Sequence, residues 1–242
     1  MNEPGVYFFD LYGTLVEIRT DEGKPSLWRG AADFYSLCGA AYRPAELRGR
    51  YLALCAEETS SLAAARPELG EAGVEIELRR VFRRLFEEKG VPVSDERVAD
   101  TALLFRSLSF VHSPRLMRGA GRTLAELRRR GARIYLLSNA QSCFTVPELK
   151  RVGLIDAFDG IFLSSDFGAR KPSPAFFTAA LARAGVSPEE ALMIGNDPDA
   201  DIRGADAVGM PSRYIHTWQS PPRGAPLPES CVEIAKLEDL LK

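Results

Sequence analysis

Histidine and cysteine are scarce in this sequence, and neither is arranged as a metal site would require. The chain contains two histidines, His112 and His216, and its four cysteines include no Cys-x-x-Cys pair. Structural zinc sites and disulfide frameworks need closely and regularly spaced residues. The sequence therefore predicts neither of them, and its scattered thiols favour a reduced, cytoplasmic setting.

An excess of charge of either sign is also lacking. Lys and Arg number 31 against 33 Asp and Glu, the formal net charge is -2, and the sequence pI is about 5.9. Binding to nucleic acid or to an anionic membrane surface depends on a basic excess. We therefore expect neither of these as a partner.

Long apolar runs are absent as well. The first apolar run, residues 6–9, is short, and no basic region precedes it. A membrane-spanning helix needs about 20 apolar residues, and a secretory signal needs a basic stretch followed by about 7–15 apolar ones. We expect no signal peptide and no membrane span.

Short apolar runs, in contrast, recur along the chain. The composition, 45% hydrophobic and 26% charged, is ordinary for a globular protein. Five runs are typical of buried strands: residues 6–9, 133–137, 160–163, 191–194 and 212–215. Helical patterns separate them, such as residues 174–184, which stop at Gly185. This alternation predicts an α/β fold with a doubly wound, Rossmann-like parallel sheet.

Residues 18–114 break that alternation. They show helical periods and few strand signals, and their apolar stripes contain Tyr51, Phe82 and Phe105. We interpret these stripes as the core of a helical bundle. The chain is therefore predicted to form an α/β core from residues 1–17 and 115–242, with residues 18–114 inserted as a helical domain.

Polar side chains follow four of the predicted strands. They are Asp10, Tyr12 and Thr14 after the first, Ser138 and Asn139 after the second, Lys171 beyond the third, and Asn196, Asp197 and Asp201 after the fourth. In an open parallel sheet, ligands bind at the carboxyl ends of the strands. We therefore expect carboxylates, a hydroxyl, an amide and one ammonium group to meet at one edge of the sheet.

These segments resemble the four motifs of the haloacid dehalogenase superfamily. They read Asp10-Leu-Tyr-Gly-Thr-Leu, Leu137-Ser-Asn, Arg170-Lys-Pro-Ser-Pro and Gly195-Asn-Asp-Pro-Asp-Ala-Asp. Each motif alone is weak evidence, but four in order, each beyond a predicted strand, are specific. The resemblance covers nearly the whole chain, and the inserted helical segment matches the cap domain that this family often carries after its first motif.

The resemblance implies a hydrolase in which Asp10 is the covalent nucleophile. It implies that Asp10, the main-chain carbonyl of Tyr12 and an acid of the fourth motif hold Mg²⁺. It also implies that Lys171 screens the charge of nucleophile and phosphate, and that Ser138 binds the transferring phosphoryl group. Thr14 and Asn139 complete the expected substrate-binding set, with Thr14 supporting the loop after the first motif.

Tyr12 departs from the pattern of the family's phosphatases, which carry a second aspartate at this position. That aspartate protonates the leaving group, whereas a phenol with an ordinary pKa near 10 is a poor general base at neutral pH. Three alternatives follow for a phosphatase without this aspartate. It is slow, it uses water or a cap residue as the acid, or it favours esters with good leaving groups. A tyrosine at position 12 makes the first motif resemble that of the 2-haloacid dehalogenase branch. Enzymes of that branch need no metal and displace halide without protonating it.

The fourth motif favours the phosphatase alternative. Dehalogenases of that branch lack its acidic pair, whereas this chain keeps Asp197 and Asp201. Asn196 occupies the place after Gly195 where a metal ligand often lies, so either Asn196 or Asp197 is the ligand. We favour Asp197 at this stage, because a charged oxygen suits a hard cation better.

The expected function is Mg²⁺-dependent hydrolysis of a small-molecule phosphate ester through an aspartyl-phosphate. Two alternatives remain open at this point: a metal-free 2-haloacid dehalogenase, and a catalytically weakened binding protein of the same fold. The sequence names neither the substrate nor the oligomeric state.

Overall fold

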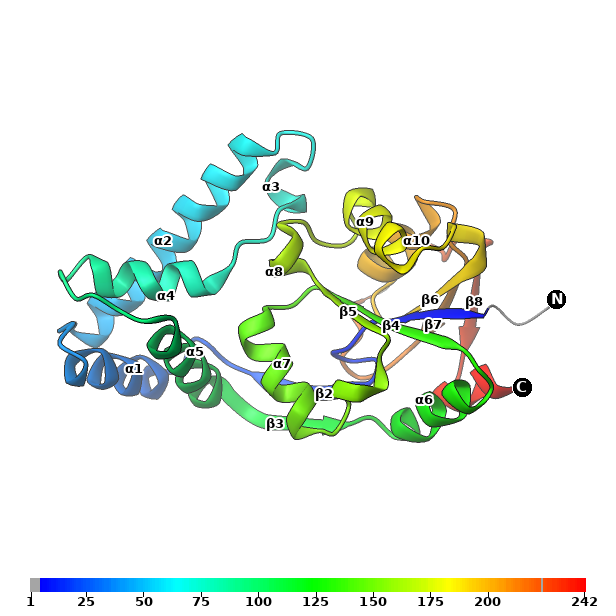
Figure 1. Cartoon of the computed structure of the whole chain (residues 1–242), viewed down its shortest axis with the longest axis horizontal. Coiled ribbons are helices and arrows are strands. Elements are labelled where there is room, and N and C mark those ends of the chain that lie inside the picture. The colour runs from blue at the N-terminus through cyan, green and yellow to red at the C-terminus, as the bar shows by residue number, and fades with distance from the viewer. Residues whose placement is uncertain (1–4, 223) are drawn as a thin grey trace.

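The computed structural model describes residues 5–222 and 224–242, so residues 1–4 of the predicted core lie outside the described residues. Its main feature is a six-stranded sheet in the order β5-β4-β1-β6-β7-β8 (Figure 1). The strands are β1 (Val6–Phe9), β4 (Arg133–Ser138), β5 (Gly160–Leu163), β6 (Ala191–Gly195), β7 (Ser212–Ile215) and β8 (Cys231–Ile234). All neighbouring strands pair in parallel, which confirms the predicted fold class.

Helices cover both faces of this sheet. They are α6 (Ala120–Arg129), α7 (Ser142–Arg151), α8 (Ser164–Phe167), α9 (Pro174–Ala184) and α10 (Gly204–Asp206). Shorter elements are the 3₁₀ helices η1 (Ile155–Ala157), η2 (Pro188–Glu190) and η4 (Leu237–Leu241) and the π-helix η3 (Pro198–Arg203). Tyr7 and Phe9 pack in one apolar cluster with α6 and η4, whereas Val6 and Phe8 pack in another with α9. Successive side chains of a strand point to opposite faces, so one short run anchors both helical layers.

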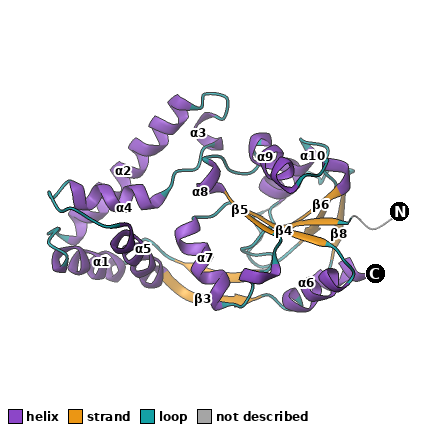
Figure 2. Ribbon diagram, viewed as in Figure 1, coloured by secondary structure: helices purple, strands orange, loops and turns teal. Residues whose placement is uncertain are grey.

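A second group of helices lies at the end of the molecule away from the six-stranded sheet (Figure 2). It contains α1 (Pro25–Leu37), α2 (Pro44–Ala65), α3 (Gly70–Gly73), α4 (Leu78–Glu87) and α5 (Asp95–Ser109). The residues of the predicted apolar stripes, Tyr51, Phe82 and Phe105, are buried in a separate apolar cluster, as predicted. Phe144 of helix α7, outside this group of helices, belongs to the same cluster. The exact division into core and cap stays a prediction.

Two strands that the sequence did not predict link these parts. β2 (Val16–Thr20) and β3 (Phe110–Leu116) form an antiparallel ribbon, and the predicted boundaries at residues 17/18 and 114/115 fall inside it. Pairing the outgoing and returning chains satisfies backbone hydrogen bonds that two separate linkers would leave to water. The link is therefore a two-stranded structure rather than a pair of loops.

None of the helices in the described part of the chain has both the length and the apolar character needed to cross a membrane.

Candidate active site

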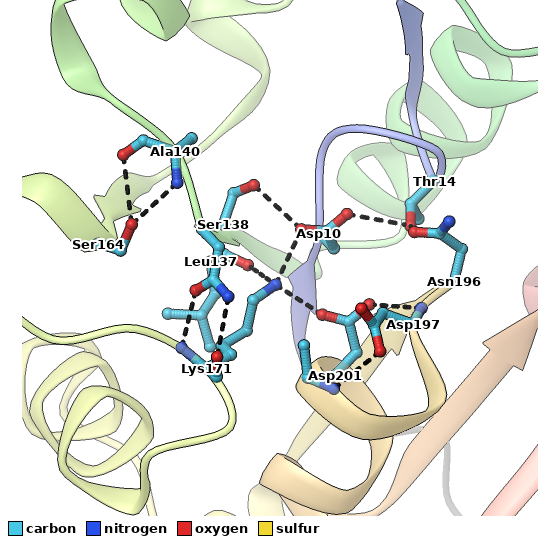
Figure 3. A network of polar contacts seen from close by, with 12 residues as sticks. Asp10, Thr14, Leu137, Ser138, Ala140, Ser164, Lys171, Asn196, Asp197 and Asp201 are labelled. Atoms are coloured by element: carbon cyan, nitrogen blue, oxygen red, sulfur yellow. Dashed lines mark hydrogen bonds and ion pairs between the residues drawn. The ribbon is translucent and has the colours of Figure 1, made fainter. Parts of the chain in front are cut away.

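Three adjacent strands bring the predicted polar residues together. Asp10 directly follows β1, and its backbone N–H donates to the Ile194 carbonyl of β6 at 2.9 Å. The neighbouring strands β4 and β6 end at Ser138 and Gly195, so Asn196 lies on one side of Asp10 and Ser138 on the other. The edge of the sheet thus gathers the first, second and fourth motifs around Asp10 (Figure 3).

Lys171 contributes the third motif as a buried cation. Its ammonium group lies 2.8 Å from Asp10 Oδ1 and 2.6 Å from Asp201 Oδ1, and it donates to the Leu137 carbonyl at 2.7 Å. Burial lowers the pKa of Lys171, but the charges of Asp10 and Asp201 outweigh that effect and raise it above the ordinary value. The ammonium therefore stays charged and bridges the carboxylate that follows β1 and the carboxylate of Asp201 on η3.

Asn139 holds Lys171 in place. Its amide oxygen accepts from the Lys171 backbone N–H at 2.7 Å, and its amide nitrogen donates to the Lys171 carbonyl at 2.9 Å. Both polar atoms of the side chain are used in this way. The structure therefore gives Asn139, a predicted substrate-binding residue, a positioning contact with Lys171.

Asp201 is almost completely buried, at 1% exposure. Burial raises its pKa to about 7, with Lys171 acting in the opposite direction. Its Oδ2 accepts from the Asp197 backbone N–H at 2.9 Å. A Cβ atom on Gly195 would lie 2.2 Å from the same oxygen, so a glycine is required here for Asp201 to approach the strand end.

Two hydroxyl groups contact the carboxylate of Asp10. Ser138 Oγ donates to Asp10 Oδ1 at 3.0 Å. Thr14 Oγ1 lies 3.4 Å from Asp10 Oδ2 and 3.2 Å from Asn196 Oδ1, so its single proton is shared between the two acceptors. Thr14 therefore links Asp10 to the fourth motif.

Asn196 and Asp197 have different surroundings. Asn196 is 4% exposed and reaches the Thr14 hydroxyl beside Asp10. Asp197 Oδ1 instead accepts from the backbone N–H groups of Asp199 and Ala200, each at 2.9 Å, and so caps the turn η3. This arrangement favours Asn196 over Asp197 as a metal ligand, the reverse of the sequence-based preference.

The donor chemistry fits Mg²⁺. Among the described residues, no group of three His, Cys, Asp or Glu side chains is arranged to hold a metal ion. The side chains that do gather are two carboxylates, Asp10 and Asp201, and the amide oxygen of Asn196. Oxygen donors of this kind are the ligands that Mg²⁺ prefers.

Tyr12 lies in a network that the sequence did not reveal. Its hydroxyl donates to Glu148 Oε2 and lies 3.0 Å from Thr145 Oγ1, both on α7. Burial, followed by the negative charge of Glu148, raises the pKa of the phenol far above its ordinary value. The side chain of Tyr12 is therefore unsuited to act as a general base, although it was among the predicted catalytic residues.

Glu148 in turn forms an ion pair with Arg106 of α5. The two charged groups are 2.6 Å apart, with side-chain exposures of 13% for Arg106 and 6% for Glu148. The guanidinium also lies over the ring of Phe144, 5.1 Å from its centroid. No local sequence pattern marks this pair, because its members lie on separate helices and are 42 residues apart.

A cavity of about 600 Å³ adjoins the strand ends. Tyr12, Asn139 and Ala140 line it from the sheet, and Glu22, Tyr51, Glu75 and Arg106 line it from the helical segment. Its size suits a small molecule.

The chain resembles known hydrolases in sequence and fold. A family model described as haloacid dehalogenase-like hydrolase matches residues 5–209. A phosphoserine phosphatase from Thermus thermophilus is 36% identical over 141 residues, which are 56% of this chain and 53% of that protein. The chain thus spans about half the length of that relative.

Solved structures share the fold. A 2-haloacid dehalogenase from Pseudomonas syringae superposes with a TM-score of 0.63 at 24% identity, covering 98% of this chain and 96% of that one. A HAD phosphatase from Thermococcus onnurineus gives a TM-score of 0.58 at 22% identity, covering 97% and 95%. At these identities the similarity establishes the fold alone, and the two proteins are named for different activities.

Proposed function

The chain belongs to the haloacid dehalogenase-like hydrolases, and on that premise we propose that it is a Mg²⁺-dependent phosphatase acting on small phosphate esters. The observation that carries this proposal is the Lys171 ammonium between Asp10 and Asp201, at 2.8 and 2.6 Å. It places positive charge beside the Asp10 carboxylate, where a phosphate dianion would bind.

The proposed reaction has two displacements at phosphorus. The Asp10 carboxylate attacks phosphorus, the bond from phosphorus to the ester oxygen breaks, and the leaving alkoxide takes a proton to become the alcohol. Water then attacks the aspartyl-phosphate at phosphorus, which releases inorganic phosphate and restores the carboxylate. Splitting one difficult displacement into two easier ones is the advantage of covalent catalysis.

The surrounding residues have separate tasks in this proposal. Lys171 and Ser138 stabilise negative charge on the transferring group. Asp10, Asp201, Asn196 and the carbonyl of Tyr12 would hold Mg²⁺, with Thr14 orienting Asn196. The ion would neutralise phosphate charge and offset the repulsion between carboxylates.

The leaving group receives no help from position 12 in this proposal. The Tyr12 hydroxyl is bound to Glu148, and its pKa is raised. General acid catalysis is typically worth about 10²–10⁴-fold. We therefore propose that solvent supplies the proton and that esters with acidic leaving groups react fastest.

We further propose that residues 18–114 act as a cap over the cavity. Glu22, Tyr51, Glu75 and Arg106 of this segment line it opposite the strand ends. A cap in this position would shield the bound ester from bulk solvent, apart from the water that the two steps need, and would select its leaving group.

Tyr12 also supports a second candidate, a metal-free 2-haloacid dehalogenase. In that reaction Asp10 would attack the carbon that bears the halogen, halide would leave without a proton, and water would hydrolyse the resulting ester. The fourth motif counts against it, because the oxygen donors of Asn196 and Asp201 would have no metal ion to bind in a metal-free reaction.

An assay with two substrate classes separates the candidates. The protein is incubated with an aryl phosphate and with a 2-chloroalkanoate, each with Mg²⁺ and with EDTA. Phosphate release that requires Mg²⁺ supports the phosphatase. Halide release that persists in EDTA contradicts it and supports the dehalogenase.

A further inference from the structure

The main-chain carbonyl of Tyr12, a proposed ligand of Mg²⁺, is not fixed by the backbone of its own loop. The N–H of Gly13 donates to the Val16 carbonyl at 2.8 Å, and the N–H of Val16 donates to the Leu11 carbonyl at 2.9 Å. Within residues 5–222 and 224–242, the N–H and the carbonyl of Tyr12 form no such backbone bond. The orientation of this peptide therefore depends on where the side chain of Tyr12 is held.

Two residues of helix α7 hold that side chain. The Tyr12 hydroxyl donates to Glu148 Oε2 and lies 3.0 Å from Thr145 Oγ1. Both partners are buried. The phenol is therefore tied at its far end, and through it the peptide that carries the carbonyl is tied to α7.

Arg106 of helix α5 holds Glu148 in turn. Its Nε donates to Glu148 Oε1 at 2.6 Å, and its Nη2 lies 3.4 Å from Oε2, the oxygen that accepts from Tyr12. Aromatic rings surround the guanidinium, with centroids at 5.1 Å for Phe144 and 5.7 Å for both Tyr12 and Phe110. A planar cation held in this way fixes the carboxylate in one orientation.

We propose that Arg106 is a positioning residue for the metal site, which orients the Tyr12 carbonyl through Glu148 and the Tyr12 hydroxyl. Without the guanidinium, the buried carboxylate of Glu148 would lose its counter-charge and would no longer be held toward the phenol. Residues that orient a metal ligand without touching the metal typically contribute about 10–100-fold to metal affinity. The helical segment that contains α5 would thus tune Mg²⁺ affinity. This inference rests on the proposed Mg²⁺-dependent function, because it assigns the support of the same site.

Mg²⁺ binding in the absence of substrate tests the inference. Isothermal titration calorimetry would give the Kd for Mg²⁺ of the unaltered protein, of Arg106→Gln, of Tyr12→Phe and of the variant that carries both. We expect each single substitution to raise the Kd at least about tenfold. Because the two residues act along one chain of contacts, the double variant should bind about as weakly as either single variant. The expectation concerns affinity for Mg²⁺ and not turnover at saturating Mg²⁺.

Arg66→Gln is the matched control. Arg66 Nη1 donates to the Phe167 carbonyl at 2.9 Å, so it also joins the helical segment to the sheet domain, but away from Tyr12. Its loss should leave the Kd for Mg²⁺ unchanged. Arg106→Lys should recover part of the affinity, because an ammonium restores the charge without the planar, two-point contact. If Arg106→Gln does not fold, Arg106→Lys and Tyr12→Phe replace it in the comparison.

The possible outcomes are distinct. An unchanged Kd in Arg106→Gln or in Tyr12→Phe, losses that multiply in the double variant, or an equal loss in Arg66→Gln would overturn the inference. No Mg²⁺ binding by the unaltered protein would overturn it together with the proposed metal dependence. Failure of the phosphatase proposal alone is distinguishable, since Mg²⁺ would then bind as expected while no ester releases phosphate.

Discussion

The hydroxyl of Tyr12 donates a hydrogen bond to the carboxylate of Glu148, 136 residues further along the chain. Glu148 also pairs with Arg106, so one carboxylate joins the loop after β1, helix α7 and helix α5. Tyr12 occupies the position where the family's phosphatases carry an acid, and its hydroxyl is held by a structural partner, Glu148. The consequences can be tested at each of the groups involved.

Tyr12→Phe should lower stability with little effect on catalysis. The variant loses the hydrogen bond to Glu148 and keeps the Arg106 pair, so we expect a loss of about 1–2 kcal/mol in the free energy of unfolding. Phosphatase turnover should stay within about threefold, because the phenol does not act as a general acid or base in the proposed reaction. Loss of a true general acid would lower the rate by about 10²–10⁴-fold. Urea unfolding and steady-state kinetics measure the two effects, and a hundredfold loss of turnover without unfolding would show that the phenol takes part in the reaction.

Leaving-group acidity should control the rate. An aryl phosphate is expected to exceed an alkyl phosphate in kcat/KM by at least about a hundredfold, because the alkoxide departs without an acid. Tyr12→Asp should narrow this ratio, and Tyr12→Phe should leave it unchanged. Equal rates for aryl and alkyl esters in the unaltered protein would mean that another group protonates the leaving oxygen.

Asp10→Asn should remove hydrolysis while leaving the protein folded. The amide keeps the shape of the side chain but is not a nucleophile, so turnover should fall at least about a thousandfold. Asp197→Asn provides a comparison, since Asp197 caps η3 rather than contacting Asp10. Circular dichroism checks folding, and activity that persists in Asp10→Asn would exclude Asp10 as the nucleophile.

Lys171→Met should destabilise the protein strongly. It leaves the buried carboxylates of Asp10 and Asp201 facing each other without their shared cation, and breaking a buried ion pair costs about 3–5 kcal/mol. Lys150→Met, at an exposed position on α7, should change the free energy of unfolding by less than about 0.5 kcal/mol. Similar urea midpoints for the two variants would contradict this account of Lys171.

Mg²⁺ should stabilise the protein more at high pH than at low pH. Burial raises the pKa of Asp201 to about 7 in the metal-free protein, while an unfolded aspartate titrates near 3.9. The folded state therefore binds the extra proton, and Asp201 lowers stability as pH rises from about 4 to 7. Mg²⁺ competes with this proton.

The shift in melting temperature on adding Mg²⁺ measures this competition. We expect it to be larger at about pH 8 than at about pH 5. In Asp201→Asn the pH dependence of the shift should largely disappear. A shift that is the same at both pH values in the unaltered protein would argue against Asp201 as a ligand.

The local pattern of the chain was enough to predict five of the six strands of the sheet, but it missed the edge strand β8. Runs such as residues 6–9 and 191–194 are apolar and short because each strand is buried on both faces. Residues 174–184 form the predicted helix, because Pro174 begins it and Gly185 ends it in a left-handed conformation. Signals of this kind depend on neighbours within a few residues and are visible in the sequence.

The helical segment was predicted less completely. Its apolar stripes identified buried faces correctly, but the ribbon of β2 and β3 was missed. Both strands are partly exposed, and each is stabilised by a partner that lies almost a hundred residues away, as the 98-residue separation of Glu17 and Arg115 shows. A strand that depends on a distant partner has a weak local signal.

Some features of the candidate site were likewise predictable from the sequence, and others were not. The sequence alone determined which residues follow the strands, and parallel pairing then required Asp10, Ser138 and Asn196 to share one edge of the sheet. Only the tertiary structure decided that Asn196 rather than Asp197 reaches Thr14, and that Tyr12 is tied to Glu148. Which polar residues follow a strand depends on the local sequence, whereas the partner of a buried polar side chain depends on which distant groups packing brings within hydrogen-bond distance.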